Sequence, residues 1–429
     1  MNITSKITAL SRSEKNRKLL GNTASLYVLQ GISFIVPLIT IPYLIRVLGT
    51  NNFGLLAFSG SLIAYFQVIV DYGFNLSATR EISIHRNDQN RISNLFCSVF
   101  LVKIILVAAS CALLTGIIFT IPRFQPDKYL FFWLFASVAG STLMPTWLFQ
   151  GLERMAYITI FNLITKVAVT CLYFVFIKTP ADYMWFAYLN SGATCIIGLI
   201  SFIFAIFTFR INLIIPTFAD CKKCLLEGFQ IFISQASVTL FTNTNTFILG
   251  IYANNQIVGS YAVAEKIVRA LISMTGPVGA AIYPRISIMF SESQSRAIRF
   301  LKKVLISGVI VFGILCCCLF VFSGSIVFAI TGAKSYEIQV LIKIMAFLPL
   351  TVFIDNIFGT QIMLNANLQK QFMQIIIAGG ILSICLLMIL IPIFNAYGSA
   401  ISFVTSQFAI LSCMIFTVQK AKIRFHWRN

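Results

Sequence analysis

The chain has 429 residues, of which 58% are hydrophobic and only 10% are charged, and its mean hydropathy is +0.89. Soluble domains carry about a quarter of their residues as charged side chains, so this composition excludes an ordinary soluble protein. The formal net charge of +19 raises the question of nucleic-acid binding, which the positions of the charges must decide.

Apolar stretches close to the ~20 residues that a membrane-crossing helix needs recur along the whole chain. They predict an all-α integral membrane protein with twelve transmembrane helices. The predicted spans are 21–48, 53–72, 92–121, 128–150, 157–177, 183–208, 228–251, 257–283, 304–330, 337–364, 371–393 and 396–419.

The longest interior polar stretch, residues 209–227, separates the first six spans from the last six. Six spans per half predict two lobes that are parallel repeats of each other. A shift of 205 residues aligns the halves and places Gly54 on Gly259 and Ala57 on Ala262. The predicted division is a basic arm (1–20), an N-lobe (21–208), a linker (209–227), a C-lobe (228–419) and a basic tail (420–429).

Lys and Arg are distributed unevenly between the two sides of the predicted bundle. The arm, the tail and every second loop hold 22 of them, whereas the alternate loops hold 4. Cytoplasmic segments of membrane proteins carry this excess, so both termini, the arm, the linker and the tail are predicted to be cytoplasmic. The basicity thus reflects topology, and we predict membrane lipids but no nucleic acid as partners.

Catalytic and metal-binding motifs are absent from the sequence. It contains no G-x-x-x-x-G-K-[ST], no H-E-x-x-H and only two histidines. Among eleven cysteines only Cys221 and Cys224 form a C-x-x-C pair, and a zinc site needs four ligands. All loops are short, with no room for an extramembrane catalytic domain. We therefore predict a transporter rather than an enzyme, with no metal and no bound cofactor.

Apart from Lys128 and Glu337, which are the first residues of two predicted spans, nine charged side chains fall within the spans, where each is costly to bury. Six are basic and three are acidic, which leaves a surplus of +3. Two interpretations are open: the charges pair across helices to hold the bundle together, or a water-filled cavity receives an anion. The bases are Arg46, Lys103, Lys166, Lys266, Arg269 and Lys343, and the acids are Asp71, Glu265 and Asp355.

The stretch AVAEKIVRAL carries three of these charges near the middle of a span. Glu265 and Arg269 are four residues apart on one helix face, in the order that favours pairing. Lys266 points about 100° away from them and has no local partner. The surplus favours the cavity interpretation for Lys266 and Arg269.

For the other charges within the spans the two interpretations are more evenly balanced. Lys103, Lys166 and Lys343 also lie deep, but either a partner or a cavity accounts for them. Arg46 and Asp71 lie closer to span ends and are able to reach the polar interface. Glu265, Asp355 and Asp71 are the candidates for orienting the bases or for coupling transport to H⁺ or Na⁺.

Several stretches resemble one family of membrane proteins. They are PLITIPYLIRVLG (37–49), Phe53-Gly54, Asp71-Tyr72-Gly73 followed by Arg80, and WLFQGLERM (147–155). The chain is similar to the polysaccharide transporter family, in particular to the Wzx-type O-antigen flippases. The resemblance extends through all twelve spans and is most specific in the first quarter.

The resemblance implies the fold of the multidrug/oligosaccharidyl-lipid/polysaccharide (MOP) exporters, with two six-helix lobes around a central cationic cavity. It implies transport of undecaprenyl-diphosphate-linked oligosaccharide from the cytoplasmic to the periplasmic leaflet of the bacterial inner membrane. Lys266 and Arg269, together with the other bases of the spans, are then expected to receive the diphosphate or an acidic sugar. An O-antigen polymerase and a chain-length regulator are the expected protein partners.

Three other functions are weighed against this expectation. A capsule or other polysaccharide exporter of the same family fits the sequence almost equally well. A MATE-type drug/cation antiporter requires an acidic cavity, which the surplus of +3 disfavours. A membrane O-unit polymerase is disfavoured because the chain has no large periplasmic loop.

Overall fold

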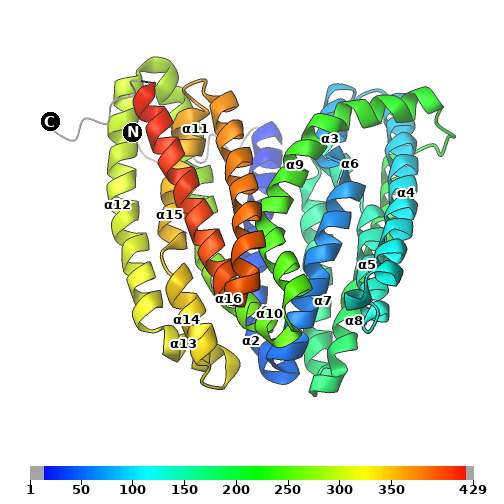
Figure 1. Cartoon of the computed structure of the whole chain (residues 1–429). Helices are drawn as coiled ribbons and strands as arrows, with labels where there is room; N and C mark the ends of the chain where they lie inside the picture. The colour runs from blue at the N-terminus through cyan, green and yellow to red at the C-terminus, as the bar shows by residue number, and fades with distance from the viewer. Residues whose placement is uncertain (1–13, 422–429) are drawn as a thin grey trace. The chain divides into compact units, whose positions relative to one another are not determined.

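The computed structural model describes residues 14–421, and every regular element in this range is helical (Figure 1). Most of the predicted arm and tail lies outside the described range. The elements of the first half are α2 (Glu14–Asp71), α3 (Phe74–Ile84), α4 (Gln89–Thr120), η1 (Pro122–Phe124), α5 (Lys128–Thr142), α6 (Thr146–Gly151), α7 (Met155–Phe176), η2 (Pro180–Asp182) and α8 (Tyr183–Phe209). Those of the second half are α9 (Phe218–Tyr252), α10 (Asn255–Ser273), α11 (Thr275–Glu292), α12 (Gln294–Val321), α13 (Ser323–Thr331), α14 (Tyr336–Met345), α15 (Leu348–Asp355), η3 (Asn356–Met363) and α16 (Gln369–Lys420).

Eight helices in the described part of the chain are long and apolar enough to cross a membrane, and a bent pair within α9 makes a possible ninth. The prediction of an all-helical membrane protein is confirmed, whereas the number twelve stays a prediction. The structure has fewer candidate spans than predicted partly because α16 counts as one helix, although it runs across a backbone break at Asn395, where φ is 49°. About 25 residues remain on either side of Asn395, enough for one crossing each.

At two other places the helices of the structure differ from the predicted spans. Residues 39–84 form one candidate span, although two spans were predicted there, because α2 continues past Gly49 and α3 follows it directly. The predicted span 257–283 is divided between α10 and α11, with the boundary at Met274. Neither part is among the candidate spans, and α10 carries three charges in its 19 residues.

The chain divides into two compact units. Unit 1 comprises residues 1–48 and 59–239, and unit 2 comprises residues 49–58 and 240–429. Within the predicted linker, a helix starts already at Phe218, because Thr217 and Asp220 cap it reciprocally: Thr217 donates to the Asp220 carboxylate, and the Asp220 N–H donates to Thr217 Oγ1. Helix α9 therefore supplies its first part to unit 1 and its second part to unit 2.

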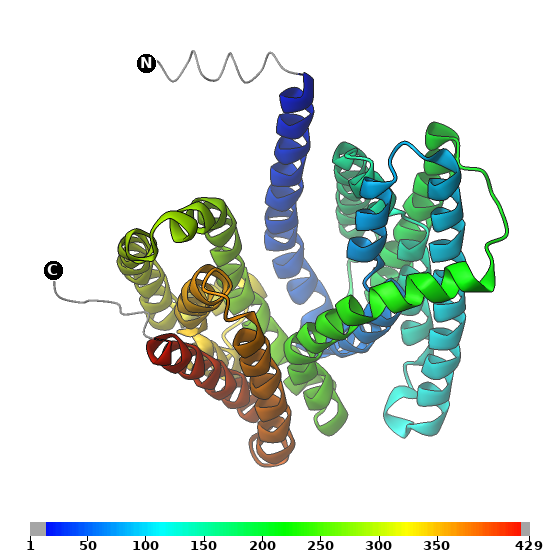
Figure 2. The same cartoon turned by 90° about the horizontal axis from the view of Figure 1, so that it is seen from above.

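Unit 1 is a bundle in which small residues allow close helix contact. A Cβ on Gly140 of α5 or on Gly198 of α8 would overlap backbone atoms of the facing helix. Such glycines let membrane helices approach each other closely. Figures 1 and 2 show the cyan and green helices of this unit gathered side by side. Its aromatic core includes Phe96 and Trp147, whose ring centroids are 5.7 Å apart.

Unit 2 contains the two glycines that the repeat alignment pairs. A Cβ on Gly259 would overlap the Thr50 carbonyl, and a Cβ on Gly54 would overlap the Asn255 carbonyl and come within 2.8 Å of the Gly259 Cα. The two positions that the alignment pairs thus contact each other. The unit's core includes Phe312 and Phe353, which stack with their centroids 4.9 Å apart.

Candidate functional site

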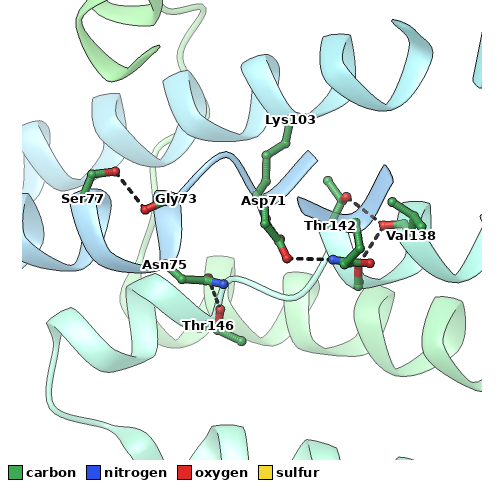
Figure 3. Close-up of polar contacts among 10 residues, drawn as sticks. Asp71, Gly73, Asn75, Ser77, Lys103, Val138, Thr142 and Thr146 are labelled. Atoms are coloured by element: carbon green, nitrogen blue, oxygen red, sulfur yellow. Dashed lines mark hydrogen bonds and ion pairs between the residues drawn. The ribbon is translucent and has the colours of Figure 1, made fainter. Parts of the chain in front are cut away.

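A buried ion pair lies at the break between α2 and α3. Helix α2 ends at Asp71 because Tyr72 and Gly73 adopt left-handed backbone angles, with φ of 43° and 77°. Lys103, in the middle of α4, places its Nζ 3.0 Å from Asp71 Oδ1 (Figure 3). The exposed fraction of the side chain is 3% for Lys103 and 23% for Asp71. The break therefore places a carboxylate opposite a lysine in the interior of unit 1.

Hydrogen bonds extend from this pair across the bundle. Gln67 Nε2 donates to Asp71 Oδ2 at 2.8 Å and lies 3.0 Å from Ser141 Oγ of α5. Nearby, Thr146 Oγ1 donates to Asn75 Oδ1 at 2.7 Å (Figure 3). The network thus connects α2, α4 and α5 through side chains alone.

A cavity of about 230 Å³ adjoins this network, and we call it the unit 1 cavity. Its walls include the residues of the network together with Asn162 and Thr165 of α7 and Thr194 of α8. Irregular backbone within a membrane protein is tolerated where it is buried in protein or lines a cavity, and the break satisfies this rule because Gly73 is buried. The surrounding helices are strongly apolar, and the walls combine these polar side chains with Met144, Ile197 and two glycines.

The sequence did not indicate that Asp71 pairs with Lys103. It predicted Asp71 near a span end, able to reach the interface or to orient a base that could not be named, whereas the structure places it against Lys103, 32 positions away. One signal was present: Gln67, Asp71 and Asn75 follow at intervals of four, which puts three polar groups on one side of an apolar segment.

The Glu265–Arg269 pair of α10 forms as its spacing predicts. Arg269 Nη2 and Nε lie 2.7 and 2.9 Å from Glu265 Oε1. The same Nη2 donates to the Thr242 carbonyl at 2.6 Å, and the guanidinium lies 5.6 Å from the centre of the Phe403 ring. Glu265 Oε2 accepts a hydrogen bond of 2.9 Å from Thr246. This pair thus fastens α10 to the second part of α9.

Lys266 is the exposed charge of α10. Among the side chains that the structure describes, no carboxylate lies within ion-pair distance of its ammonium group. Its neighbour Arg269 is 33% exposed at the side chain and has its partners as described. The two bases that were predicted to act together therefore have different surroundings, and Lys266 is the more available cation.

The remaining predicted site residues are Arg46 and Lys166 of unit 1 and Lys343 of unit 2. Arg46 is exposed, and Lys166 is partly buried on α7 without being part of the unit 1 cavity wall. Lys343 of α14 is partly buried, with its Nζ 5.6 Å from the centre of the Phe320 ring. The structure thus joins Lys103 to Asp71 and Arg269 to Glu265, and each unit contains three of the six bases.

Asp355 is the one predicted acid that has no basic partner in the described residues. It is 9% exposed at the end of α15, and Gln407 of α16 donates to its Oδ2. Its Oδ1 has no hydrogen-bond partner within the described structure. The π-helix Asn356–Met363 follows directly, and such segments are frequent at functional sites. Of the three acids in the predicted spans, Asp71 and Glu265 form ion pairs in the described part of the chain, and Asp355 does not.

Comparison with known proteins identifies the family. The family described as "Polysaccharide biosynthesis protein" matches residues 19–290, well over half of the chain. The chain belongs to this family. It is 29% identical to the "Putative O-antigen transporter" of Escherichia coli (strain K12) over 403 residues, which cover 94% of this chain and 97% of the relative. The resemblance seen in the sequence is thus confirmed, and this family member is a membrane transporter rather than an enzyme.

Solved structures identify the fold. An inward-facing MATE family multidrug transporter of the MOP superfamily superposes with a TM-score of 0.67 at 14% identity, covering 92% of this chain and 100% of that one. The lipid II flippase MurJ in an inward closed conformation gives a TM-score of 0.63 at 11% identity, covering 93% and 87%. At these identities the likeness shows the fold alone, which is that of the MOP transporters.

Proposed function

We propose that this transporter is a flippase for undecaprenyl-diphosphate-linked O-antigen repeat units. It moves them by alternating access from the cytoplasmic to the periplasmic leaflet of the bacterial inner membrane. The observation that carries the proposal is the end-to-end similarity to a relative named as an O-antigen transporter. The MOP fold, which a lipid II flippase shares, supports it.

Lys266 is the residue that we propose for the anionic part of the substrate. A diphosphate needs a cation whose donors are not already satisfied, and an ammonium group binds phosphate as a point charge. Lys266 is exposed and has no acidic partner among the described residues, whereas Arg269 already binds Glu265 and the Thr242 carbonyl. Arg269 then holds α10 against α9 and keeps Lys266 in position.

The charges argue against a drug/cation antiporter. Asp71 is paired with Lys103, and Glu265 is paired with Arg269, so neither carboxylate offers a free negative charge to a cationic drug. Asp355 remains as the candidate for coupling transport to H⁺ or Na⁺, since one of its oxygens has no partner in the described residues.

The function is tested in a strain that lacks this gene and in proteoliposomes. We expect lipid-linked O-antigen repeat units to accumulate on the cytoplasmic face of the deletion strain, and the intact gene to restore O-antigen display. In proteoliposomes, collapsing both the proton and the sodium gradient is expected to slow transport. Normal O-antigen display in the deletion strain would refute the proposed substrate, and transport that ignores both gradients would refute the coupling alone.

The proposed topology has a separate test. Both termini and the segments around Arg86, Lys222 and Arg296 are expected to face the cytoplasm, because basic residues are retained on that side. Fusions of alkaline phosphatase to these segments are expected to be inactive, and fusions near Lys178 and Lys334 to be active. An active fusion near Lys222 would contradict the assignment of every span.

A further inference from the structure

The walls of the unit 1 cavity have unused hydrogen-bond donors. Lys103 Nζ carries three protons. One is directed to Asp71, and the ammonium group makes no other hydrogen bond within the described chain. Asn75 accepts through Oδ1, but its Nδ2 protons have no partner there either. A lysine that is only 3% exposed needs further acceptors, because an under-bonded charge is costly at this depth. The cavity is therefore expected to hold oxygen atoms.

Unused acceptors face the same space from other helices. Asn162 donates through Nδ2 to the Ile158 carbonyl, which leaves its Oδ1 available. Thr165 and Thr194 donate their hydroxyl protons to the carbonyls of Phe161 and Asn190, so each hydroxyl oxygen retains lone pairs. The walls thus combine donors from α3 and α4 with acceptors from α7 and α8.

This combination excludes most classes of ligand. A phosphate only accepts, and it would face the Asp71 carboxylate and three neutral acceptors. A metal cation or an amine would face Lys103, and an apolar ligand would leave these donors and acceptors in the wall unsatisfied. The Lys103–Asp71 ion pair has no net charge, so a bound ligand needs no net charge to balance it. The complement is a neutral ligand in which each group both donates and accepts, which means hydroxyl groups.

We propose that the unit 1 cavity binds one neutral sugar ring of the transported glycan. The inference rests on the proposed function, which supplies the polyhydroxylated substrate. The volume of about 230 Å³ is below the ~300 Å³ at which pockets for drug-sized ligands begin, and so suits a single ring rather than a whole repeat unit. The same volume would otherwise hold about seven water molecules, at ~30 Å³ each.

The experiment measures sugar binding without transport. The full-length protein in lipid nanodiscs is examined by saturation-transfer NMR with free glucose, galactose, N-acetylglucosamine and rhamnose. The test variant is Thr165→Val/Thr194→Val, which keeps the shape of both side chains and removes two acceptors. We expect the wild type to bind at least one sugar, and the variant to bind it about tenfold more weakly.

The matched control places the same change on the same two helices. Thr170→Val/Thr208→Val alters α7 and α8 outside the cavity wall and is expected to bind like the wild type. Should the test variant fail to accumulate, Asn162→Ala removes a third acceptor and is expected to weaken binding similarly. The subsite is overturned if no sugar binds, or if test and control variants bind equally, as a cavity that holds only water predicts.

Failure of the sugar subsite and failure of the proposed function give different results. Sugar binding that depends on Thr165 and Thr194, in a protein that moves no lipid-linked oligosaccharide, would refute the proposed function and leave the subsite in place. Intact transport of lipid-linked oligosaccharide by the Thr165→Val/Thr194→Val variant, with sugar binding unchanged, would refute the subsite and leave the function in place.

Discussion

Replacing Lys103 with methionine is expected to lower the free energy of unfolding by about 3 kcal/mol, because it leaves the Asp71 carboxylate without its counterion. The pair is 3.0 Å long, and Lys103 is almost fully buried in unit 1. After the substitution, Gln67 is the remaining side-chain donor to Asp71. The measurement is thermal unfolding of the detergent-solubilised protein, together with its abundance in membranes.

Removing both charges tests whether Lys103 stabilises the protein through its ion pair with Asp71 or through the lysine side chain alone. The double variant Asp71→Asn/Lys103→Met is expected to recover most of the lost stability, since no orphan charge remains. The control is the Arg86–Glu153 pair, which is also 3.0 Å long but has side chains that are 39% and 57% exposed. Arg86→Met is expected to cost less than about 1 kcal/mol. Equal losses in Lys103→Met and in the double variant would contradict the assignment.

Lys266→Gln is expected to abolish most O-antigen display while the protein accumulates normally. The ammonium group is exposed and makes no ion pair in the described structure, so its loss costs little stability, whereas the proposed substrate loses its cationic partner. Display is measured in the deletion strain complemented with each variant, and abundance is measured by immunoblot. Normal display by Lys266→Gln would refute its proposed role.

The neighbouring pair is expected to behave in the opposite way. Arg269→Gln leaves Glu265, whose side chain is 9% exposed, with Thr246 as its remaining side-chain partner, and is expected to cost about 3 kcal/mol and much of the protein's abundance. Glu265→Gln/Arg269→Gln is expected to recover abundance and a substantial part of display. Persistent loss of display at normal abundance in the double variant would instead make Arg269 a substrate-binding residue alongside Lys266.

The amino-acid sequence by itself determined that the protein lies in a membrane, that it is all-helical and to which family it belongs. These properties follow from local composition: apolar stretches must become helices in a bilayer, whatever their neighbours are. The contact between Glu265 and Arg269 was predictable for the same reason, because residues four apart share a face of any α-helix. The stretch PLITIPYLIRVLG and the motif Asp71-Tyr72-Gly73 likewise indicated the family from the sequence alone, with no knowledge of the fold.

Only the tertiary structure decided which buried charges meet. Asp71 and Lys103 come together because α2 breaks at Tyr72 and Gly73 and because α4 packs beside that break, and neither event is encoded in the spacing of the two residues. Asp355 was expected to share the same chemistry as the other acids, yet packing gives it Gln407 instead of a base. Charge pairing inside a membrane is decided by cross-helix distance, because Coulomb attraction becomes strong only between groups that packing brings within a few ångströms.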